Sequence, residues 1–433
     1  MPELPTVTAP DLARTLAAVL LPPVVKGPIV RRPRAVGLLG RLGADDAAVR
    51  QMQRLRERYG PDPVQLNLAG RRMALLLDPE DVHRVLNGSP EPFTPASLEK
   101  RGALGHFQPA GVLVSGPADR LLRRPFNEAV LQPGPSVHPV VGVRMAQVVA
   151  EEVDALLGQV DFAGELAWDA FARTWWRIVR RVVLGDSARE DEQVTDDLQT
   201  LRRLANLSYA APRRPALRDR FLGRVQHYVQ QAEPGSLAEV VARTPAAPGT
   251  EPHQQIPQWL FAFDAGSWAS VRALALLVAH PPAMERAREE LDRSPDLPFL
   301  RATVLDSIRL WPTTPLILRD TTEETTWRTG TLPAGASVVI FAPFFHRDGQ
   351  RLPQAHTFDP DQWLRERTDA DWPLVPFSGG PAMCPGRNVV LLVASTVLAG
   401  LVGSRTFGCS EDLDPARLPG SLDMFGLRFP VLT

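Results

Sequence analysis

The chain has 433 residues, 44% of them hydrophobic, and a formal net charge of −1. This length and apolar content are enough to bury a large core. The near-neutral charge excludes the broad basic field that nucleic-acid binding requires, so we expect no nucleic-acid partner. Two cysteines, Cys384 and Cys409, provide no disulfide framework, which favours a reducing, cytoplasmic setting.

The N-terminal residues differ in composition from the rest of the chain. Residues 1–44 are rich in proline and show little periodicity, so we predict an irregular arm here and one large domain over residues 45–433. The apolar run over 16–30 is interrupted by prolines, a lysine and a glycine, and it is too short to cross a bilayer. We therefore expect no membrane anchor.

Apolar residues recur at helical spacing in several long segments and alternate over 64–77, where they favour a hairpin. The segment 93–115 has little periodicity, and long loops of this kind are often functional. In it Phe107 is a candidate pocket residue, with core packing as the alternative. The predicted helices are 45–59, 78–86, 139–157, 162–184, 191–207, 218–231, 257–280, 300–310 and 388–401. Strands over 316–319 and 332–340 and a hairpin over 421–429 complete a fold that is mainly α with a small β region.

The clearest chemical signal lies in residues 376–387. Cys384 stands at the start of a predicted helix, where free first-turn N–H groups and the helix dipole favour a thiolate. Gly380 and Gly386 allow the backbone to approach a bulky planar group, and Phe377 can shield the sulfur. The alternative is a buried structural cysteine in a tight turn.

The pattern Phe377-x-x-Gly380-x-x-x-Cys384-x-Gly386 resembles the haem-binding signature of cytochromes P450. The resemblance implies a b-type haem, iron protoporphyrin IX, with the Cys384 thiolate as its axial metal ligand. It also implies the cytochrome P450 fold for residues 45–433. Phe377 and Gly386 would then be cofactor-binding residues beside the sulfur.

Two arginines are implied as haem propionate ligands. Residues 119–127 resemble the family's His-x-x-x-Arg helix, which assigns Arg123, although Asp119 replaces the histidine and an ordinary surface arginine is the alternative. Arg319, on the strand after the 300–310 helix, is the second. Because Ala382 stands where the family commonly has a histidine or arginine, anchoring would depend mainly on Arg123 and Arg319.

The segment 257–280 resembles the long helix on the oxygen side of the haem, which usually carries Ala-Gly-x-(Asp/Glu)-Thr. One register places the acid on Asp264 and the threonine on Ala265, and a competing register places them on Trp268 and Ala269. The first is preferred because it gives a buried carboxylate a purpose, while a capping or paired Asp264 is the alternative. Both registers lack the threonine that helps to deliver protons, so Ser267, water or a substrate hydroxyl would have to assist.

The helix over 300–310 contains Asp306-x-x-Arg309, which resembles the family's Glu-x-x-Arg ion pair behind the cysteine loop. Residues 358–363 resemble its Phe-x-Pro-x-Arg element, with Gln362 in place of the arginine. We expect a weaker network around Arg309. The residues implied to line the substrate pocket are Phe107, Phe263, Thr314, Leu316, Ile317, Met424 and Phe425.

The resemblance implies a haem-thiolate monooxygenase of secondary metabolism. It would oxidise a small apolar or aromatic organic substrate with O2 and electrons from an external ferredoxin and ferredoxin reductase, and act as a monomer. The alternatives are a peroxide-driven or oxidative-coupling enzyme and a non-catalytic haem-binding sensor or carrier, which the missing threonine makes plausible. The sequence does not specify the substrate.

Overall fold

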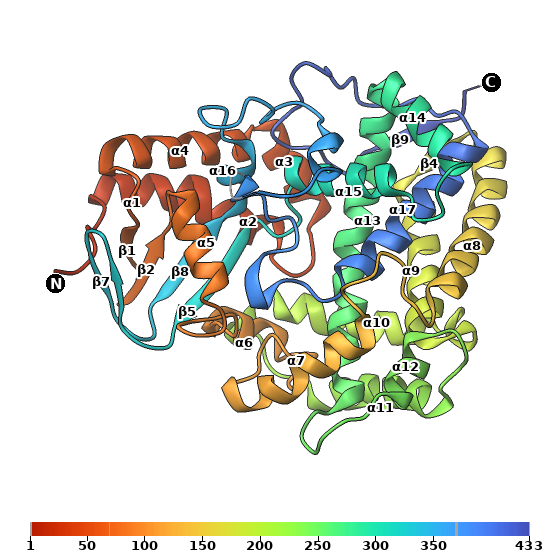
Figure 1. The fold of residues 1–433 in the computed structure, drawn as a ribbon, viewed down its shortest axis with the longest axis horizontal. Coiled ribbons are helices and arrows are strands. Elements are labelled where there is room, and N and C mark those ends of the chain that lie inside the picture. Colours follow the sequence, from red (N-terminus) through yellow and green to blue (C-terminus); the bar gives the residue numbers. More distant parts are fainter. Residues whose placement is uncertain (1, 69, 369–370, 433) are drawn as a thin grey trace.

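The computed structural model describes residues 2–68, 70–368 and 371–432. A sheet-containing part lies at one end of the molecule, on the left in Figure 1, and a larger helical part lies at the other. The main sheet has the order β1-β2-β8-β5-β3, in which only β2 and β8 run parallel. Its strands are β1 (Val64–Leu68), β2 (Arg71–Leu75), β8 (Ser337–Phe341), β5 (Leu316–Thr321) and β3 (Phe93–Thr94). Two small antiparallel sheets pair β4 (Glu165–Ala167) with β9 (Arg428–Pro430), and β6 (Thr325–Trp327) with β7 (Gly330–Leu332).

Helices make up most of the remaining structure, so the expected mainly α fold with a small β region is confirmed. Four helices precede β1: α1 (Ala9–Thr15), α2 (Leu21–Lys26), α3 (Pro33–Arg41) and α4 (Ala44–Tyr59). The next eight are α5 (Pro79–Asn87), α6 (Leu98–Leu104), α7 (Pro117–Leu131), α8 (Gly142–Ala163), α9 (Trp168–Leu184), α10 (Glu192–Ala205), α11 (Pro215–Gln231) and α12 (Leu237–Arg243). The last five are α13 (Ile256–Ala279), α14 (Pro281–Leu291), α15 (Pro298–Leu310), α16 (Ala342–Arg347) and α17 (Arg387–Ser404).

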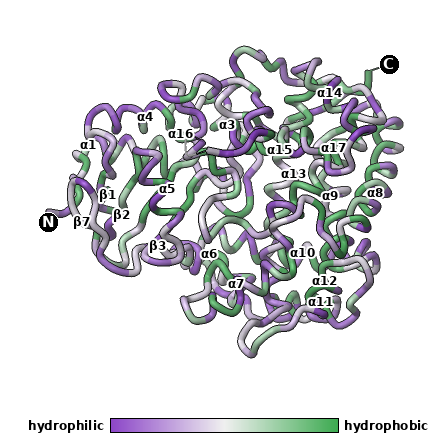
Figure 2. Tube along the Cα trace, in the orientation of Figure 1, coloured by the Kyte–Doolittle hydropathy of each residue, from purple (hydrophilic) through white to green (hydrophobic). Residues whose placement is uncertain are grey.

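The centre of the helical part is α13, which contacts α9, α15 and α17. Because neighbours cover it on several sides, α13 is apolar around most of its circumference, whereas the peripheral α4 is strongly hydrophilic (Figure 2). Among the described residues, two helical stretches, Pro252–Ala279 and Arg387–Ser404, are long and apolar enough to span a bilayer. In each, more than half of the most apolar window is buried inside the fold, as in core helices of a globular protein.

The prediction of an irregular arm over residues 1–44 is wrong. This segment contains α1, a π-helical turn over Leu16–Leu20, α2 and α3, and the side chain of Val19 is fully buried. The prolines that were interpreted as helix breakers lie in first turns, with Pro22 at the start of α2 and Pro33 at the start of α3. Proline lacks an N–H group that the first turn does not use, so it favours helix starts.

Two further expectations need correction. The segment 93–115 is not structureless, because it contains β3 and α6, whose N-cap Ser97 accepts a hydrogen bond from the backbone N–H of Lys100 at 3.4 Å. The segment 421–429 does not form a hairpin. Its end, β9, pairs instead with β4, more than 250 residues earlier in the chain. A partner so distant in sequence leaves no local pattern to detect.

Behind the cysteine loop, Asp306 and Arg309 form the expected ion pair, and both side chains have no solvent exposure. Asp306 accepts bonds from Arg309 Nε at 2.5 Å, Gln362 Nε2 at 2.9 Å, and Trp363 Nε1 at 3.0 Å. It also accepts the backbone N–H of Asp359 at 2.8 Å. Gln362 therefore joins the network as a neutral donor to the carboxylate, in place of the arginine that the family usually has there, while its own Oε1 has no partner among the described residues.

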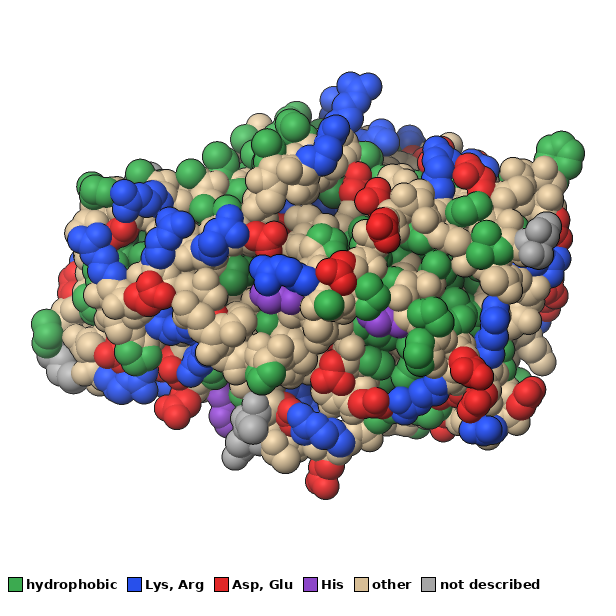
Figure 3. Space-filling model, turned by 90° about the horizontal axis from the view of Figure 1, so that it is seen from above, with side chains coloured by type: hydrophobic (Ala, Val, Ile, Leu, Met, Phe, Trp, Pro, Cys, Tyr) green, Lys and Arg blue, Asp and Glu red, His purple; other side chains and the backbone are tan. Residues whose placement is uncertain are grey.

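The outer surface carries charges of both signs. On the face seen in Figure 3, basic and acidic side chains lie interspersed. This distribution agrees with the formal net charge of −1.

We predict that Asp306→Ala lowers the free energy of unfolding by about 3–5 kcal/mol, because Arg309 keeps its buried charge without its partner. Gln362→Ala, which removes one neutral donor, should cost only about 1 kcal/mol. Urea unfolding followed by circular dichroism measures both. Equal losses in the two variants would contradict the assignment of Asp306 as the centre of the network.

Candidate active site

The cysteine loop is fixed by a close backbone approach. Gly380 has φ +63°, and a Cβ atom built on it would lie 2.2 Å from the carbonyl oxygen of Leu86 on α5. Only glycine fits this position. The backbone N–H of Cys384 donates to the carbonyl oxygen of Phe377 at 3.0 Å, which closes the loop over seven residues. Gly386 then caps α17. The spacing of this motif therefore follows from the geometry of one turn.

Burial decides the state of the Cys384 thiol in the protein alone. Loss of solvation raises the thiol pKa, while the backbone N–H of Gly386 and the charges of Arg124 and Arg387 act in the opposite direction. The raised pKa is contrary to the expectation from the helix start, because desolvation outweighs the helix terminus. A bound metal cation would reverse this balance, since a coordinating thiol is deprotonated.

Cys384 opens into a cavity of about 300 Å³. The cysteine loop contributes Phe377, Cys384 and Gly386 to its lining, and α13 contributes an uninterrupted wall over residues 261–266 together with Trp268. Small side chains at Ala262, Ala265 and Gly266 leave room along this helix.

Positive side chains gather at one side of this cavity without carboxylate partners. Arg319 is only 2% exposed and donates to Ser89 Oγ at 2.9 Å and to the carbonyl oxygen of Leu318 at 3.0 Å. Lys100 Nζ donates to the carbonyl oxygens of Pro95 at 3.0 Å and Leu318 at 3.2 Å. Burial lowers the pKa of Arg319 to about 10 and, aided by the charge of Arg319, that of Lys100 to about 7. Among the described residues no carboxylate lies within 4 Å of either cation.

The carboxylate on α13 is engaged by an arginine from α10. Asp264 lines the cavity, and its Oδ2 is paired with Arg202, whose side chain has no solvent exposure. The guanidinium of Arg202 also lies 5.0 Å from the ring of Phe261. Asp264 is paired, but with a buried arginine and not at the surface as the alternative expected, and its functional role stays a prediction.

Ser267 does not reach the cavity. Its hydroxyl donates to the backbone carbonyl oxygen of Asp264 at 2.7 Å, within its own helix, and the side chain is buried. Ala265 lines the cavity as a methyl group. Trp268 also lines it, so both registers of the helix motif have a residue on the cavity, and the choice between them stays a prediction.

Comparison with known proteins identifies this arrangement. A sequence model of the family described as Cytochrome P450 matches residues 258–412, which include α13 and the cysteine loop. The fold of the chain is that of solved cytochromes P450, and the sequence of this segment is similar to that family. A solved cytochrome P450 described as CYP102L1 superposes with a TM-score of 0.73 at 16% identity, covering 100% of this chain and 99% of the other. The cyanobacterial CYP120A1 bound to retinoic acid gives 0.69 at 18% identity, covering 88% and 93%.

Curated relatives match part of the chain. A probable cytochrome P450 4s3 of Drosophila melanogaster is 30% identical over 176 residues, which cover 39% of this chain and 36% of the relative. A cyclooctat-9-en-7-ol 5-monooxygenase of Streptomyces melanosporofaciens is 33% identical over 158 residues, covering 33% and 34%. The matched region thus spans about a third of the length of these relatives.

The donor set of this cavity fits a haem. A thiol at the wall of a cavity can bind iron, and Arg319 and Lys100, which have no carboxylate partner among the described residues, suit a planar group that carries two carboxylates. Lys100 was missed in the sequence because α6 itself was missed. A short helix with a Ser-x-x-Lys start carries no signal that places its lysine in a cavity.

The structure places Arg123 outside the cavity lining, and its predicted role as a propionate ligand stays a prediction. Its Nη1 bonds Ser115 Oγ at 2.9 Å, it pairs with Asp119 at 3.1 Å, and it is absent from the cavity lining. The next residue, Arg124, lines the cavity and pairs with Glu128 at 2.7 Å. One residue turns a helix by about 100°, so a one-residue error in register exchanges a cavity position for a packed one.

The predicted substrate residues divide into two groups. Phe263, Thr314, Leu316 and Ile317 line the cavity. Phe107 does not. It is fully buried, and its ring centroid lies 5.7 Å from that of Phe261, so the packing alternative holds. Met424 and Phe425 also lie outside the cavity, and the ring of Phe425 packs against Trp168 at 5.0 Å, because the expected hairpin tip does not form.

We predict that Arg124→Leu weakens haem retention by roughly tenfold, because a charge-assisted hydrogen bond to a propionate is lost. Arg123→Leu, the matched control one residue earlier, should keep haem affinity within about twofold. Transfer of haem to an excess of apomyoglobin, followed at the Soret band, measures both. If Arg123→Leu released haem faster than Arg124→Leu, the corrected register would be wrong.

A second prediction concerns His346, which holds the start of the cysteine loop. Its Nε2 accepts the backbone N–H of Val375 at 3.0 Å, so the imidazole is neutral. Burial and the nearby charge of Arg309 lower its pKa to about 3. Because the folded-state pKa lies below the unfolded value near 6.5, this histidine stabilises the fold above pH 6.5 and loses that contribution as the pH falls towards 3.

We therefore expect the stability of the wild-type protein to fall more steeply below pH 6.5 than that of His346→Gln, by up to about 1.4 kcal/mol per pH unit. Glutamine can still accept the Val375 bond but does not titrate. Urea unfolding at pH 7.5, 6.5 and 5.5 gives both slopes. Parallel pH dependence in the two proteins would show that His346 does not act as a buried neutral base.

Proposed function

We propose that this protein is a haem-thiolate monooxygenase of the cytochrome P450 family that binds haem b and oxidises a small apolar or aromatic substrate with O2. The single observation that carries the proposal is that Cys384, α13 and a set of unpaired cations share one cavity. In this proposal electrons come from an external ferredoxin-type donor, and the protein acts as a cytoplasmic monomer in secondary metabolism.

The residues that would hold the cofactor follow from the geometry. Cys384 would supply the axial thiolate, and Arg319, Lys100 and Arg124 would bind the two propionates. When bound, a haem with a thiolate ligand supplies the chemistry that activates oxygen, since electron donation from sulfur favours cleavage of the O–O bond. Phe377 lies on the cavity wall near the sulfur and would limit its contact with water.

The substrate class follows from the lining. Many of the side chains that line the cavity are apolar, among them Val112, Leu113, Trp259, Phe261, Phe263, Leu316 and Ile317. Such a wall removes apolar surface from water and offers few directional bonds, so it favours an apolar ligand. Two solved structures of similar fold are described with retinoic acid and with progesterone, ligands that are mostly hydrocarbon, which supports this choice.

Proton delivery in this protein would differ from the family's usual acid and alcohol. Ala265 has no hydroxyl, and the hydroxyl of Ser267 is used within α13. Asp264 Oδ2 is paired with Arg202, and within the described chain Oδ1 has no hydrogen-bond partner. We propose that Oδ1 holds a water molecule, which transfers its proton towards the oxygen side of the cavity.

The missing hydroxyl also favours a second candidate, a peroxide-driven or oxidative-coupling haem-thiolate enzyme, in which less proton delivery is required of the protein. A haem-binding sensor without turnover is the third. Product formation with a ferredoxin, its reductase, NAD(P)H and O2, compared with formation from hydrogen peroxide alone, separates the three. Turnover only with reductase supports the monooxygenase, and turnover with neither supports the sensor.

We predict that Cys384→Ser abolishes the red-shifted Soret band of the ferrous carbon monoxide complex, because that shift requires a thiolate ligand. Cys409→Ser is the matched control, since Cys409 is the other cysteine and lies outside the cavity. It should leave the spectrum unchanged. Retention of the red-shifted band in Cys384→Ser would refute the haem-thiolate assignment.

A further inference from the structure

The segment between α2 and α3, residues 27–31, forms part of the cavity wall. Pro28 and Ile29 both line the cavity that contains Cys384. Gly27 fixes the start of the segment, because its φ is +92° and a Cβ atom there would lie 2.0 Å from the carbonyl oxygen of Val30. Ile29 is partly buried and packs against the main core. A short segment near the N-terminus thus reaches the candidate substrate site.

One amide side chain at the end of α10 holds this segment. Asn206 Oδ1 accepts the backbone N–H groups of Ile29 at 2.8 Å and Val30 at 3.0 Å, and its Nδ2 donates to the carbonyl oxygen of Val30 at 2.9 Å. Arg202, the partner of Asp264, also donates to the carbonyl oxygen of Ile29 at 3.4 Å. The backbone at Ile29 is therefore tied to α10 on both its donor and acceptor sides.

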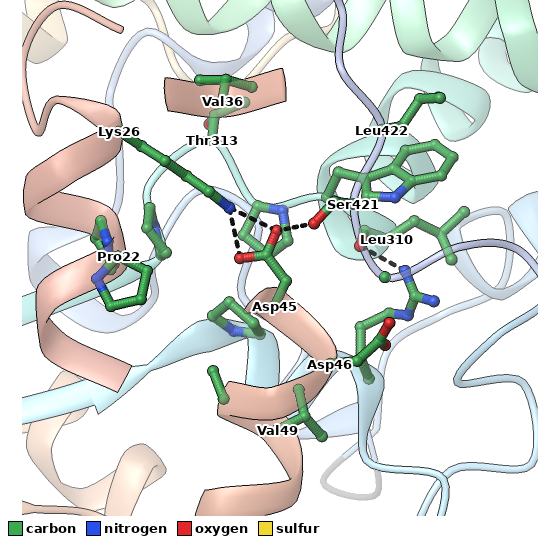
Figure 4. A pocket seen from close by; sticks show the side chains of 18 of the residues that line it. Pro22, Lys26, Val36, Asp45, Asp46, Val49, Leu310, Thr313, Ser421 and Leu422 are labelled. Carbon is green, nitrogen blue, oxygen red and sulfur yellow. Dashed lines mark hydrogen bonds and ion pairs between the residues drawn. The ribbon is translucent and has the colours of Figure 1, made fainter. Parts of the chain in front are cut away.

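The two ends of the segment are anchored to other elements. At its C-terminal end, Arg31 Nη2 donates to the carbonyl oxygen of Thr313 at 2.7 Å, and its guanidinium lies 5.3 Å from the ring of Trp268. Just before the segment, Lys26 Nζ donates to both carboxylate oxygens of Asp45 at 2.7 Å, as Figure 4 shows. Because the backbone of residues 27–31 is held at several points, a ligand can displace the Ile29 side chain only at a large cost in free energy.

A second cavity of about 70 Å³ is lined by Arg31 of this segment and also by Lys26 and Asp45, which Figure 4 shows. The two cavities share Trp268 and Thr313. Residues 27–31, together with Trp268 and Thr313, therefore limit how far a ligand can extend towards the second cavity.

We propose that Ile29 is a specificity-determining residue that limits the size of apolar ligands in this cavity, and that Asn206 is the residue that positions it. The inference rests on the proposed function, because it requires a haem and a ligand in the cavity. Ile29 excludes ligands that extend from the haem towards residues 27–31 and admits shorter ones. Removal of Asn206 takes away the hydrogen bonds to Ile29 and Val30, so the segment yields more easily and the Ile29 side chain restricts ligand size less.

The test uses two azoles whose nitrogen binds haem iron, imidazole as the short probe and clotrimazole as the long one, in spectral titrations of the holoprotein. Ile29→Trp should weaken clotrimazole binding by about tenfold through overpacking and change imidazole binding less than about twofold. Val25→Trp, four residues earlier on an exposed position of α2 outside the cavity, is the matched control and should change neither.

Asn206 is tested by a double-mutant cycle. In an Asn206→Ala background, the effect of Ile29→Trp on clotrimazole should shrink to less than about threefold, because the segment can then yield. An unchanged ratio of clotrimazole to imidazole affinity in Ile29→Trp would overturn the role of Ile29. An undiminished effect in the double variant would overturn the role of Asn206. A wild-type protein without an azole spectrum would refute the haem-thiolate proposal itself, and this inference with it.

Discussion

The fixed position of the Cys384 sulfur is the constraint on which the rest of the site depends. It results from a backbone contact that only glycine permits, at Gly380 against Leu86, and from the bond between the Cys384 N–H and the Phe377 carbonyl oxygen. His346 holds the segment that leads into this loop. The loop is thus anchored by backbone groups, which tolerate little displacement, and its position is insensitive to most surface changes.

The wall formed by α13 is mostly apolar, yet it carries the carboxylate of Asp264. A lone ionised carboxylate would be costly there, and the pairing of Asp264 with Arg202 removes much of that cost. Arg202 comes from α10 and also bonds the backbone of Ile29. One buried guanidinium therefore connects α10, α13 and the N-terminal segment, so any movement of α10 would disturb the acid and the wall together.

The sequence predicts best where local pattern and geometry coincide. The cysteine loop, the core helix α13 and the pair Asp306 and Arg309 each follow from spacing within one turn or one helix. It predicts poorly where position depends on rotation or on distant partners. Arg123 and Arg124 are equivalent in composition and differ only in the direction they face, and β9 finds its partner far away in the chain. The N-terminal helices were missed because proline breaks a helix interior but favours a helix start.

The positive charges of Arg319 and Lys100 in the cavity favour the binding of a group with two negative charges. Arg319 and Lys100 share the carbonyl oxygen of Leu318 as an acceptor, an arrangement that satisfies hydrogen bonds but leaves two positive charges close together. Loss of solvation lowers the pKa of both groups, and the charge of Arg319 lowers the pKa of Lys100 further. Two carboxylates on one rigid planar molecule would neutralise both charges at once and fix the orientation of the plane relative to Cys384. Separate small anions could neutralise the charges but could not define that orientation.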